Sequence, residues 1–165
     1  MRVIVRSSPI HAAGVFAIDP IPKGTRVLEY TGERMPHEAA DALYDHRPYT
    51  YLFGFGDGSH VIDGYGLAMY VNHSCDPNCE TEEDDHGHVW IDAMRDIVPG
   101  EELTYDYFLY DGDDEAPCTC GHANCRGTMY SPKEIRRRKR KEATEKRSAE
   151  APSGSTKSSK KGTTA

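Results

Sequence analysis

The chain has 165 residues, of which 37% are hydrophobic and 28% charged, as is usual for a soluble protein with one domain and one core. Residues 1–130 contain 8 Lys and Arg against 23 Asp and Glu, whereas residues 131–165 contain 12 against 4. The acidic part should attract cationic polypeptide and repel nucleic acid, and the basic tail should do the reverse; a plainer alternative is that acidic surface only confers solubility. Because the sequence shows neither a signal peptide nor a run that spans a bilayer, we expect an intracellular protein, cytoplasmic or associated with a nucleus or nucleoid.

Short apolar or alternating runs dominate the chain and predict β-strands, with turn signals such as Pro99-Gly100 between them. These runs are residues 3–6, 15–18, 27–30, 49–55, 60–62, 89–93 and 103–107. Residues 36–45 predict one helix, and a basic segment from Pro132 to Arg147 predicts a second. Residues 149–165, rich in Ser, Thr, Gly and Lys, predict disorder. The sequence therefore predicts a mostly β protein with few short helices.

Five segments carry the chemistry. In chain order they are SPIHAAGVFA (8–17), EYTGE (29–33), NHSCDPNC (72–79), GEELTYDY (100–107) and CTCGHANCRG (118–127). Over about residues 1–130 they resemble the SET domain of protein-lysine methyltransferases, followed by its post-SET zinc module. The resemblance implies several small curved β-sheets with a knot-like threading of the C-terminal segment. It divides the chain into a SET domain (1–110), a post-SET zinc module (111–130) and a basic, largely disordered tail (131–165).

The resemblance also implies an activity, the transfer of methyl groups from S-adenosylmethionine to the side-chain amine of lysine in a basic, histone-like protein. Such an in-line displacement requires alignment, exclusion of water and a neutral lysine, whose pKa is lowered by burial in an apolar channel. Tyr107 resembles the catalytic tyrosine of the family, and Tyr30 a wall of the lysine channel. Tyr105 stands where the family has Phe or Tyr, and a tyrosine there favours mono- or dimethylation. A lone tyrosine in a β-rich chain would instead be a core residue.

Cofactor contacts follow from the same resemblance. The residues implied are His11, Ala13, Gly14, Val15, Tyr51, Asn72, His73, Met129 and Tyr130. For the last two, anchoring of the tail is the alternative role. The family usually has Gly-x-Gly where this chain has Ala12-Ala13-Gly14, and Ala tolerates a positive φ less well than Gly. Met69 also replaces a usual Arg, so the network around it must differ.

Three of the five cysteines form a tight C-x-C-x4-C cluster, Cys118, Cys120 and Cys125. Such spacing favours a metal over a disulfide framework. Structural zinc takes four tetrahedral ligands, and the family pattern supplies Cys75 as the fourth. Cys79 would then be a small buried residue. The rival interpretation is a free-standing zinc knuckle that binds nucleic acid, against which the acidic charge of residues 1–130 counts.

The basic run RRRKRK at 136–141 has three interpretations. It can tether nucleic acid or direct nuclear entry, and nucleic acid would then be a partner of the 133–147 tail. It can also be a self-substrate or pseudosubstrate of the acidic site, or simply a solvated tail. Acidic residues at 84–85 and 111–115 are expected to flank the lysine channel. Two functions compete with the enzyme: a catalytically silent SET-like module that binds basic peptides or scaffolds chromatin, and a zinc protein that binds nucleic acid through its tail.

Overall fold

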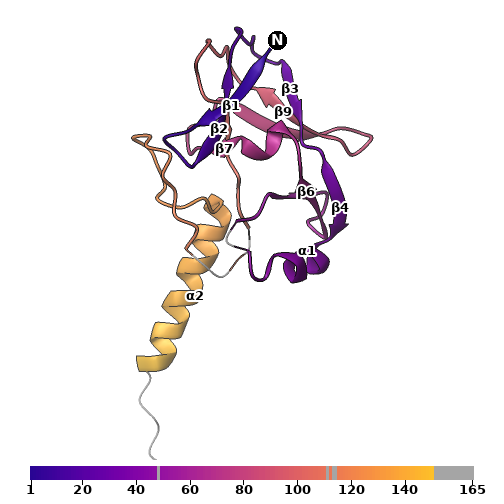
Figure 1. Cartoon of the computed structure of the whole chain (residues 1–165). Coiled ribbons are helices and arrows are strands. Elements are labelled where there is room, and N and C mark those ends of the chain that lie inside the picture. Colours follow the sequence, from indigo (N-terminus) through magenta and orange to yellow (C-terminus); the bar gives the residue numbers. More distant parts are fainter. Residues whose placement is uncertain (48, 111, 113–114, 151–165) are drawn as a thin grey trace, which may run out of the picture.

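The computed structural model describes residues 1–47, 49–110, 112 and 115–150. Over this part of the chain, short strands form four small sheets, with one short helix beside them and one long helix after them (Figure 1). The strands are β1 Val3–Ser7, β2 Ala13–Ala17, β3 Arg26–Glu29, β4 Gly32–Pro36, β5 Leu52–Phe55, β6 His60–Gly64, β7 Asn72–His73, β8 Cys79–Glu83, β9 Val89–Ala93 and β10 Thr104–Tyr105. The helices are α1 His37–Tyr44, the 3-10 turn η1 Leu67–Tyr70 and α2 Pro132–Glu150. The predicted fold class is confirmed.

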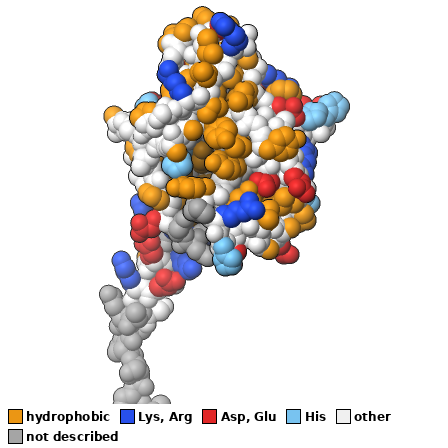
Figure 2. Space-filling view, viewed as in Figure 1, with side chains coloured by type: hydrophobic (Ala, Val, Ile, Leu, Met, Phe, Trp, Pro, Cys, Tyr) orange, Lys and Arg blue, Asp and Glu red, His pale blue; other side chains and the backbone are white. Residues whose placement is uncertain are grey.

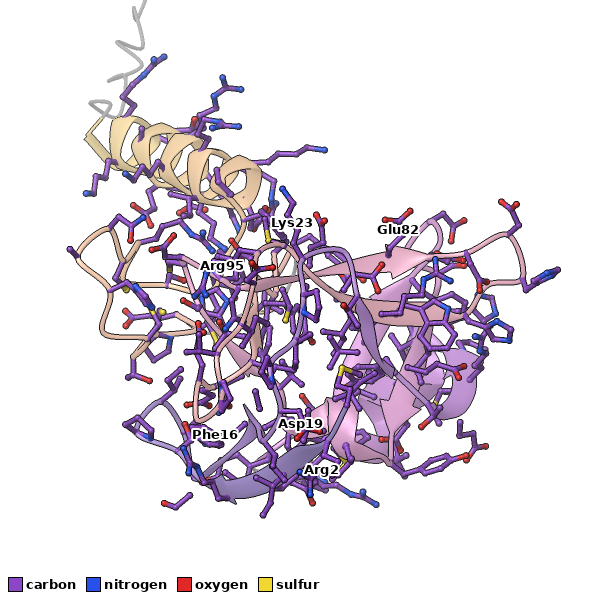
Figure 3. All side chains as sticks on the ribbon, turned by 90° about the horizontal axis from the view of Figure 1, so that it is seen from above. Arg2, Phe16, Asp19, Lys23, Glu82 and Arg95 are labelled. Carbon is purple, nitrogen blue, oxygen red and sulfur yellow. The ribbon has the colours of Figure 1, made fainter. Side chains whose placement is uncertain are left out.

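The core lies between the sheets β1-β2 and β3-β9-β8 and the short turn η1. In β9 the side chains alternate between buried and half-buried, and Ile91 at its centre is fully buried. Ile21, Ile62, Val71 and Leu103 bring other segments into the same cluster, each almost completely buried. Burial of this apolar surface is the main stabilising contribution. At the outer end of the first sheet, Arg2 donates two hydrogen bonds to Asp19, at 3.2 and 2.8 Å (Figure 3).

A parallel pair of two-residue strands positions the candidate site. In it, Thr104 of β10 lies opposite Asn72 of β7, and Tyr105 lies opposite His73. Parallel strands need a crossover connection, and here the β8–β9 hairpin lies within it. Asn78 holds the crossover, since its side-chain oxygen accepts a hydrogen bond from the Thr104 N–H at 2.8 Å. The NHSC and ELTYDY segments therefore lie side by side.

The two-residue strand β7 was not predicted as a strand from the apolar runs, and neither were the longer strands β4 and β8. Both are rich in charged or helix-breaking residues (GERMP and CETEE), and both form sheet edges, where one side of a strand faces water. Pairing with the more apolar β6 and β9 creates them, so tertiary context overrides weak local propensity. The helix predicted at 36–45 is α1, and the second predicted helix is α2, which continues three residues beyond the expected end.

The segment that follows β10 returns to the body of the protein before α2 begins. Isolated bridges join Leu109 to Tyr130 and Pro117 to Thr128. Helix α2 then extends away from the sheets (Figure 1). The division into SET domain, zinc module and tail remains a prediction. Disorder was expected for residues 149–165, but residues 149 and 150 are the last residues of α2, and residues 151–165 lie outside those described. No helix in the described ranges has both the length and the apolar character needed to cross a membrane.

Candidate active site

Aromatic side chains from two of the motifs and from strand β5 meet beside the β7–β10 pair. The Tyr105 ring lies 4.8 Å from the Tyr107 ring and 6.2 Å from that of Phe53, centre to centre, and Phe53 lies 5.0 Å from Tyr30. Tyr30 and Tyr105 are buried, and Tyr107 is half-buried. The three tyrosines that the sequence proposed as catalytic are therefore neighbours. Phe53, which the sequence analysis placed only in a strand, joins them because β5 is the edge strand next to β6.

Backbone carbonyls accept the hydroxyl protons of two of these tyrosines. The Tyr30 hydroxyl donates to the Tyr51 carbonyl at 2.7 Å, and the Tyr107 hydroxyl donates to the Val71 carbonyl at 3.0 Å. Burial raises the pKa of Tyr30, Tyr105 and Tyr107 above the ordinary value for a phenol, and the proximity of other ionisable groups raises it further. All three phenols therefore stay protonated at neutral pH. They can donate hydrogen bonds and line a channel, but they cannot act as bases there.

His73 connects the segment that follows β10 with the cysteine cluster. Its Nδ1 accepts a hydrogen bond from the Tyr107 backbone N–H at 3.1 Å, which requires a neutral ring with the proton on Nε2. That Nε2 lies 3.4 Å from the Cys75 sulfur. Burial lowers the pKa of His73 to about 4, although the nearby Asp106 opposes this shift. The imidazole thus spans the distance between the Tyr107 backbone and a predicted zinc ligand.

A polar network joins the first motif to β7 and to the start of the GEELTYDY segment. The Asn72 amide donates to the Ala13 carbonyl at 2.9 Å and lies 2.7 Å from a carboxylate oxygen of Glu102. The Ser8 hydroxyl lies 2.8 and 2.9 Å from the two Glu102 oxygens. A Cβ at Gly14 would lie only 2.1 Å from the nearer of these, so this strand position requires glycine. Glu102 and Ser8 were not singled out from the sequence, because their role depends on contacts across 94 residues.

The first motif departs from the usual family pattern at Ala12, and the structure shows the consequence. Ala12 has φ of +30°, in the left-handed region that favours glycine. The concern raised by Ala in place of Gly is therefore justified at position 12. Ala13 and Gly14, which follow, are part of β2 and have no such strain.

The four cysteines predicted to bind zinc converge. Their sulfur atoms all lie within 4.8 Å of one another, and those of Cys75 and Cys118 are 3.7 Å apart. Tetrahedral zinc with Zn–S bonds of about 2.3 Å requires sulfur–sulfur distances of about 3.8 Å. The Arg126 backbone N–H points at the Cys75 sulfur at 3.4 Å, and the Gly127 N–H at the Cys125 sulfur at 3.4 Å, contacts that favour thiolates. The donor set, spacing and polar surroundings fit a structural zinc ion.

Cys79 is separate from that cluster. It is fully buried in the core, and burial raises the pKa of its thiol to about 12. It therefore behaves as the small apolar residue that the sequence predicted.

An ion pair fixes the cysteine cluster to the aromatic site. Arg126 donates two hydrogen bonds to the Asp106 carboxylate, at 2.6 and 2.8 Å, and little of that carboxylate is exposed. Asp106 lies between Tyr105 and Tyr107 in the chain, and Arg126 follows Cys125. Such a bidentate pair holds both groups in a fixed orientation. It was missed from the sequence, although the D of TYDY and the R of CRG belong to the motifs already noted.

Comparison with known families identifies this arrangement. The SET domain family matches residues 12–108, more than half of the chain. The chain belongs to the SET-domain family. The cysteine cluster that follows the matched residues is compatible with a post-SET zinc module.

Several relatives share this domain. Histone-lysine N-methyltransferase ATX2 of Arabidopsis thaliana is 37% identical over 140 residues, which is 78% of this chain and 13% of ATX2. The histone-lysine N-methyltransferase, H3 lysine-4 specific, of Saccharomyces cerevisiae is 40% identical over 141 residues, 77% of this chain and 13% of the relative. For trithorax of Drosophila melanogaster, identity is 39% over 129 residues, 72% of this chain and 3% of the relative. The chain thus spans a small part of these relatives' length.

The remaining predicted residues of the SET domain range from exposed to fully buried. His11 is exposed with its ring 5.5 Å from that of Tyr49, and Tyr51 is partly exposed beside Tyr70. Ile10 accepts a hydrogen bond from Thr119, so the first motif lies against the cysteine loop. Val15 is fully buried in the core, so any contribution from it to ligand binding would come from its backbone.

The two candidate adenine contacts at the end of the zinc module differ in exposure. Met129 is half-buried, whereas Tyr130 is buried with the Arg138 guanidinium 3.8 Å from its ring centre. Tyr130 therefore anchors α2, as the alternative interpretation expected.

Asp84, expected near the channel, instead closes its own hairpin. Its carboxylate accepts hydrogen bonds from the backbone N–H groups of His86 and His88, both at 2.9 Å, and from the Trp90 indole at 3.1 Å. These bonds lower the pKa of Asp84. Of the other acidic residues expected to flank the channel, 111, 113 and 114 lie outside the described residues.

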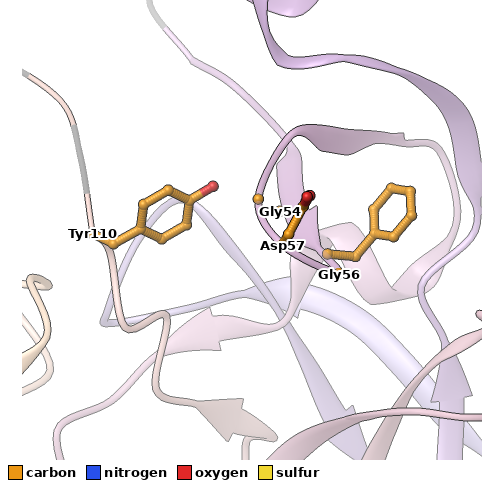
Figure 4. Close-up of a pocket in the computed structure, with 6 residues that line it drawn as sticks. Gly54, Gly56, Asp57 and Tyr110 are labelled. Carbon is orange, nitrogen blue, oxygen red and sulfur yellow. The ribbon is translucent and has the colours of Figure 1, made fainter.

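The surface of the SET domain carries exposed aromatic and apolar side chains. Figure 2 shows hydrophobic side chains gathered across the middle of one face. A cavity of about 220 Å³ lies between Tyr110 and the β5–β6 turn (Figure 4). The Tyr110 hydroxyl lies so close to Gly54 that a Cβ there would be 2.7 Å away. The segment after Tyr107 therefore packs against the hairpin that carries Phe53.

Proposed function

We propose that this chain is a protein-lysine methyltransferase that uses S-adenosylmethionine and modifies a basic, histone-like protein. The observation that supports this most directly is the convergence of Tyr30, Tyr105 and Tyr107 beside the β7–β10 pair of a SET domain. The names of the relatives, histone-lysine N-methyltransferases, agree with that chemistry. The H3 lysine-4 specificity in the name of the Saccharomyces cerevisiae relative is a property of that protein. For this chain we propose only that the substrate is histone-like.

The proposed chemistry requires little acid or base catalysis. S-Adenosylmethionine supplies an electrophilic methyl group on a sulfonium. With that donor bound, formation of the nitrogen–carbon bond would be matched by loss of the sulfur–carbon bond, whose electron pair would stay on sulfur. The lysine must arrive neutral, and since the phenols stay protonated its proton passes to water. Packing of aromatic walls from Tyr30, Phe53 and Tyr105 around the lysine stem disfavours its charged form by desolvation and keeps the reacting pair aligned and dry.

Individual roles follow from the contacts of each residue. Tyr107 would orient donor and acceptor at the reacting centre, held there by His73 and by the Val71 carbonyl. Tyr105 would limit the space around the amine, which favours mono- or dimethylation. Asn72, His73, Tyr51, Met129 and the backbone of residues 11–15 would form the cofactor pocket. Zinc held by the four cysteines would couple folding of the C-terminal segment to completion of the site.

The substrate would add to an existing strand. β5 is the outer strand of the β4-β6-β5 sheet, so its free edge can pair with an extended peptide. The acidic charge of residues 1–130 favours a basic one.

The decisive test incubates the full chain with labelled methyl donor and a panel of basic proteins, and includes the chain alone. Label on a lysine of one substrate is expected, together with a loss of roughly 100-fold or more in Tyr107→Phe. Calorimetry should show that Tyr107→Phe still binds the donor. A chain that binds no donor would instead be a silent SET-like module, and full activity in Tyr107→Phe would exclude the role assigned to its hydroxyl.

A further inference from the structure

Helix α2 is firmly attached at its start. Ser131 caps its N-terminus, since the Ser131 side chain accepts a hydrogen bond from the Glu134 backbone N–H at 3.2 Å. The buried Glu134 carboxylate also accepts hydrogen bonds from Arg137 and Arg138. The Arg138 guanidinium lies over the Tyr130 ring. The helix is therefore an ordered extension of the domain over Pro132–Glu150.

The base of α2 lies next to the active-site strand. The Ser131 N–H donates to the Leu109 carbonyl at 2.9 Å, and Leu109 is two residues beyond Tyr107. Anything bound along α2 is thus held at a fixed position relative to the site.

One side of α2 carries a stripe of cations. Lys133, Arg136, Arg140 and Arg147 follow one another at intervals of three, four and seven residues, which places them on one face of a helix. From Lys133 to Arg147, 14 positions further along the helix, the stripe is about 21 Å long. All four side chains are exposed. The first three, with Arg137, line a cavity of about 540 Å³ that Tyr110 borders on the other side.

We propose that this stripe binds the phosphate backbone of nucleic acid and holds the SET domain against it. A line of cations about 21 Å long can lie along a duplex and neutralise several of its closely spaced phosphates. Helix α2 contains no Asn or Gln, the side chains that read adenine, so any sequence preference would have to come from arginine contacts with guanine, and we expect contacts with phosphates to dominate. The helix also extends away from the acidic body, which would otherwise repel a polyanion (Figure 1).

A membrane surface is the less suitable partner. Interfacial helices bury a broad apolar face among lipids, whereas the sequence of α2, PKEIRRRKRKEATEKRSAE, offers only Ile135 and two alanines besides Pro132. Ile135 is moreover half-buried against the protein. An acidic peptide remains as an outcome of the test below.

The test measures binding of the full chain to a fluorescent 20-base-pair duplex by anisotropy between 50 and 200 mM salt. Arg136→Gln with Arg140→Gln removes two charges from the stripe. Lys141→Gln with Lys146→Gln removes two exposed charges that lie about 110° around the helix from the centre of the stripe, and serves as the control. Both proteins keep residues 151–165, so the lysines there contribute equally, and far-UV circular dichroism checks the helix.

We expect the stripe variant to bind at least about tenfold more weakly at 100 mM salt, with a log–log salt slope shallower by about two. The control should change by less than about threefold. Equal losses in the two variants, no binding by the unmodified chain at 50 mM salt, or equal competition by polyglutamate of the same charge would overturn the proposal. Because no donor is present, these results do not depend on methyl transfer. Methylation of a free basic peptide should be unchanged in the stripe variant.

Discussion

Substitution of Gly14 by Ala tests the network that joins the first motif to the active-site strands. The added Cβ would lie 2.1 Å from one Glu102 oxygen and 3.0 Å from the Asn72 side-chain nitrogen, far inside the usual contact distance of about 3.5 Å. The Glu102 carboxylate can retreat only by leaving Ser8 and Asn72. Overpacking costs about 1–3 kcal/mol and a hydrogen bond to a charged group about 1.5–3 kcal/mol. We therefore expect Gly14→Ala to lower the free energy of unfolding by about 2–4 kcal/mol.

A double-mutant cycle isolates the cause. In a Glu102→Ala background the obstructing carboxylate is gone, so adding Gly14→Ala should cost less than about 1 kcal/mol more. In a Glu102→Gln background, which keeps the size of the side chain, the cost should stay near its full value. Urea unfolding followed by Trp90 fluorescence measures each variant, and calorimetry measures donor binding. If Gly14→Ala and Glu102→Ala are additive within about 0.5 kcal/mol, the reasoning about this contact is wrong.

Three further substitutions or conditions test other parts of the site. Tyr105→Phe should shift products toward trimethyl-lysine in mass spectrometry, and an unchanged product distribution would refute its role in limiting space. Cys120→Ser should lose bound zinc and activity together, whereas Cys79→Ser should retain one zinc per chain by elemental analysis; zinc retained in the first would exclude the four-cysteine site. Buried Tyr30, Tyr105 and Tyr107 have raised pKa values, so the folded state needs them protonated. Ionisation of these tyrosines should therefore leave the free energy of unfolding unchanged below about pH 9. Above about pH 10 it should lower that free energy by up to about 1.4 kcal/mol per pH unit for each tyrosine. Tyr105→Phe should remove one tyrosine's share, and an identical dependence of stability on pH in this variant would contradict the reasoning.

Local patterns in the sequence were sufficient for much of the secondary structure. The run at 89–93 coincides with β9, and Pro36 and Pro132 mark the starts of the two helices. The S-x-x-E pattern at Ser131 and Glu134, typical of a helix N-terminus, was a readable signal that went unused. Strands β4 and β8 could not be predicted, because their residues are poor strand formers and only the neighbouring strand stabilises them.

The sequence by itself determined the kinds of residue available for chemistry: three tyrosines, an Asn-His pair and four candidate zinc ligands, within motifs that are specific enough to indicate a family. Only the tertiary structure decided which of them meet. The parallel pairing of β7 with β10, the Arg126–Asp106 pair and the Glu102 network each join segments 20 to 94 residues apart. Hydrogen bonding and packing act over a few ångströms in space, so a pattern read along the chain does not contain them until the fold has brought those segments together.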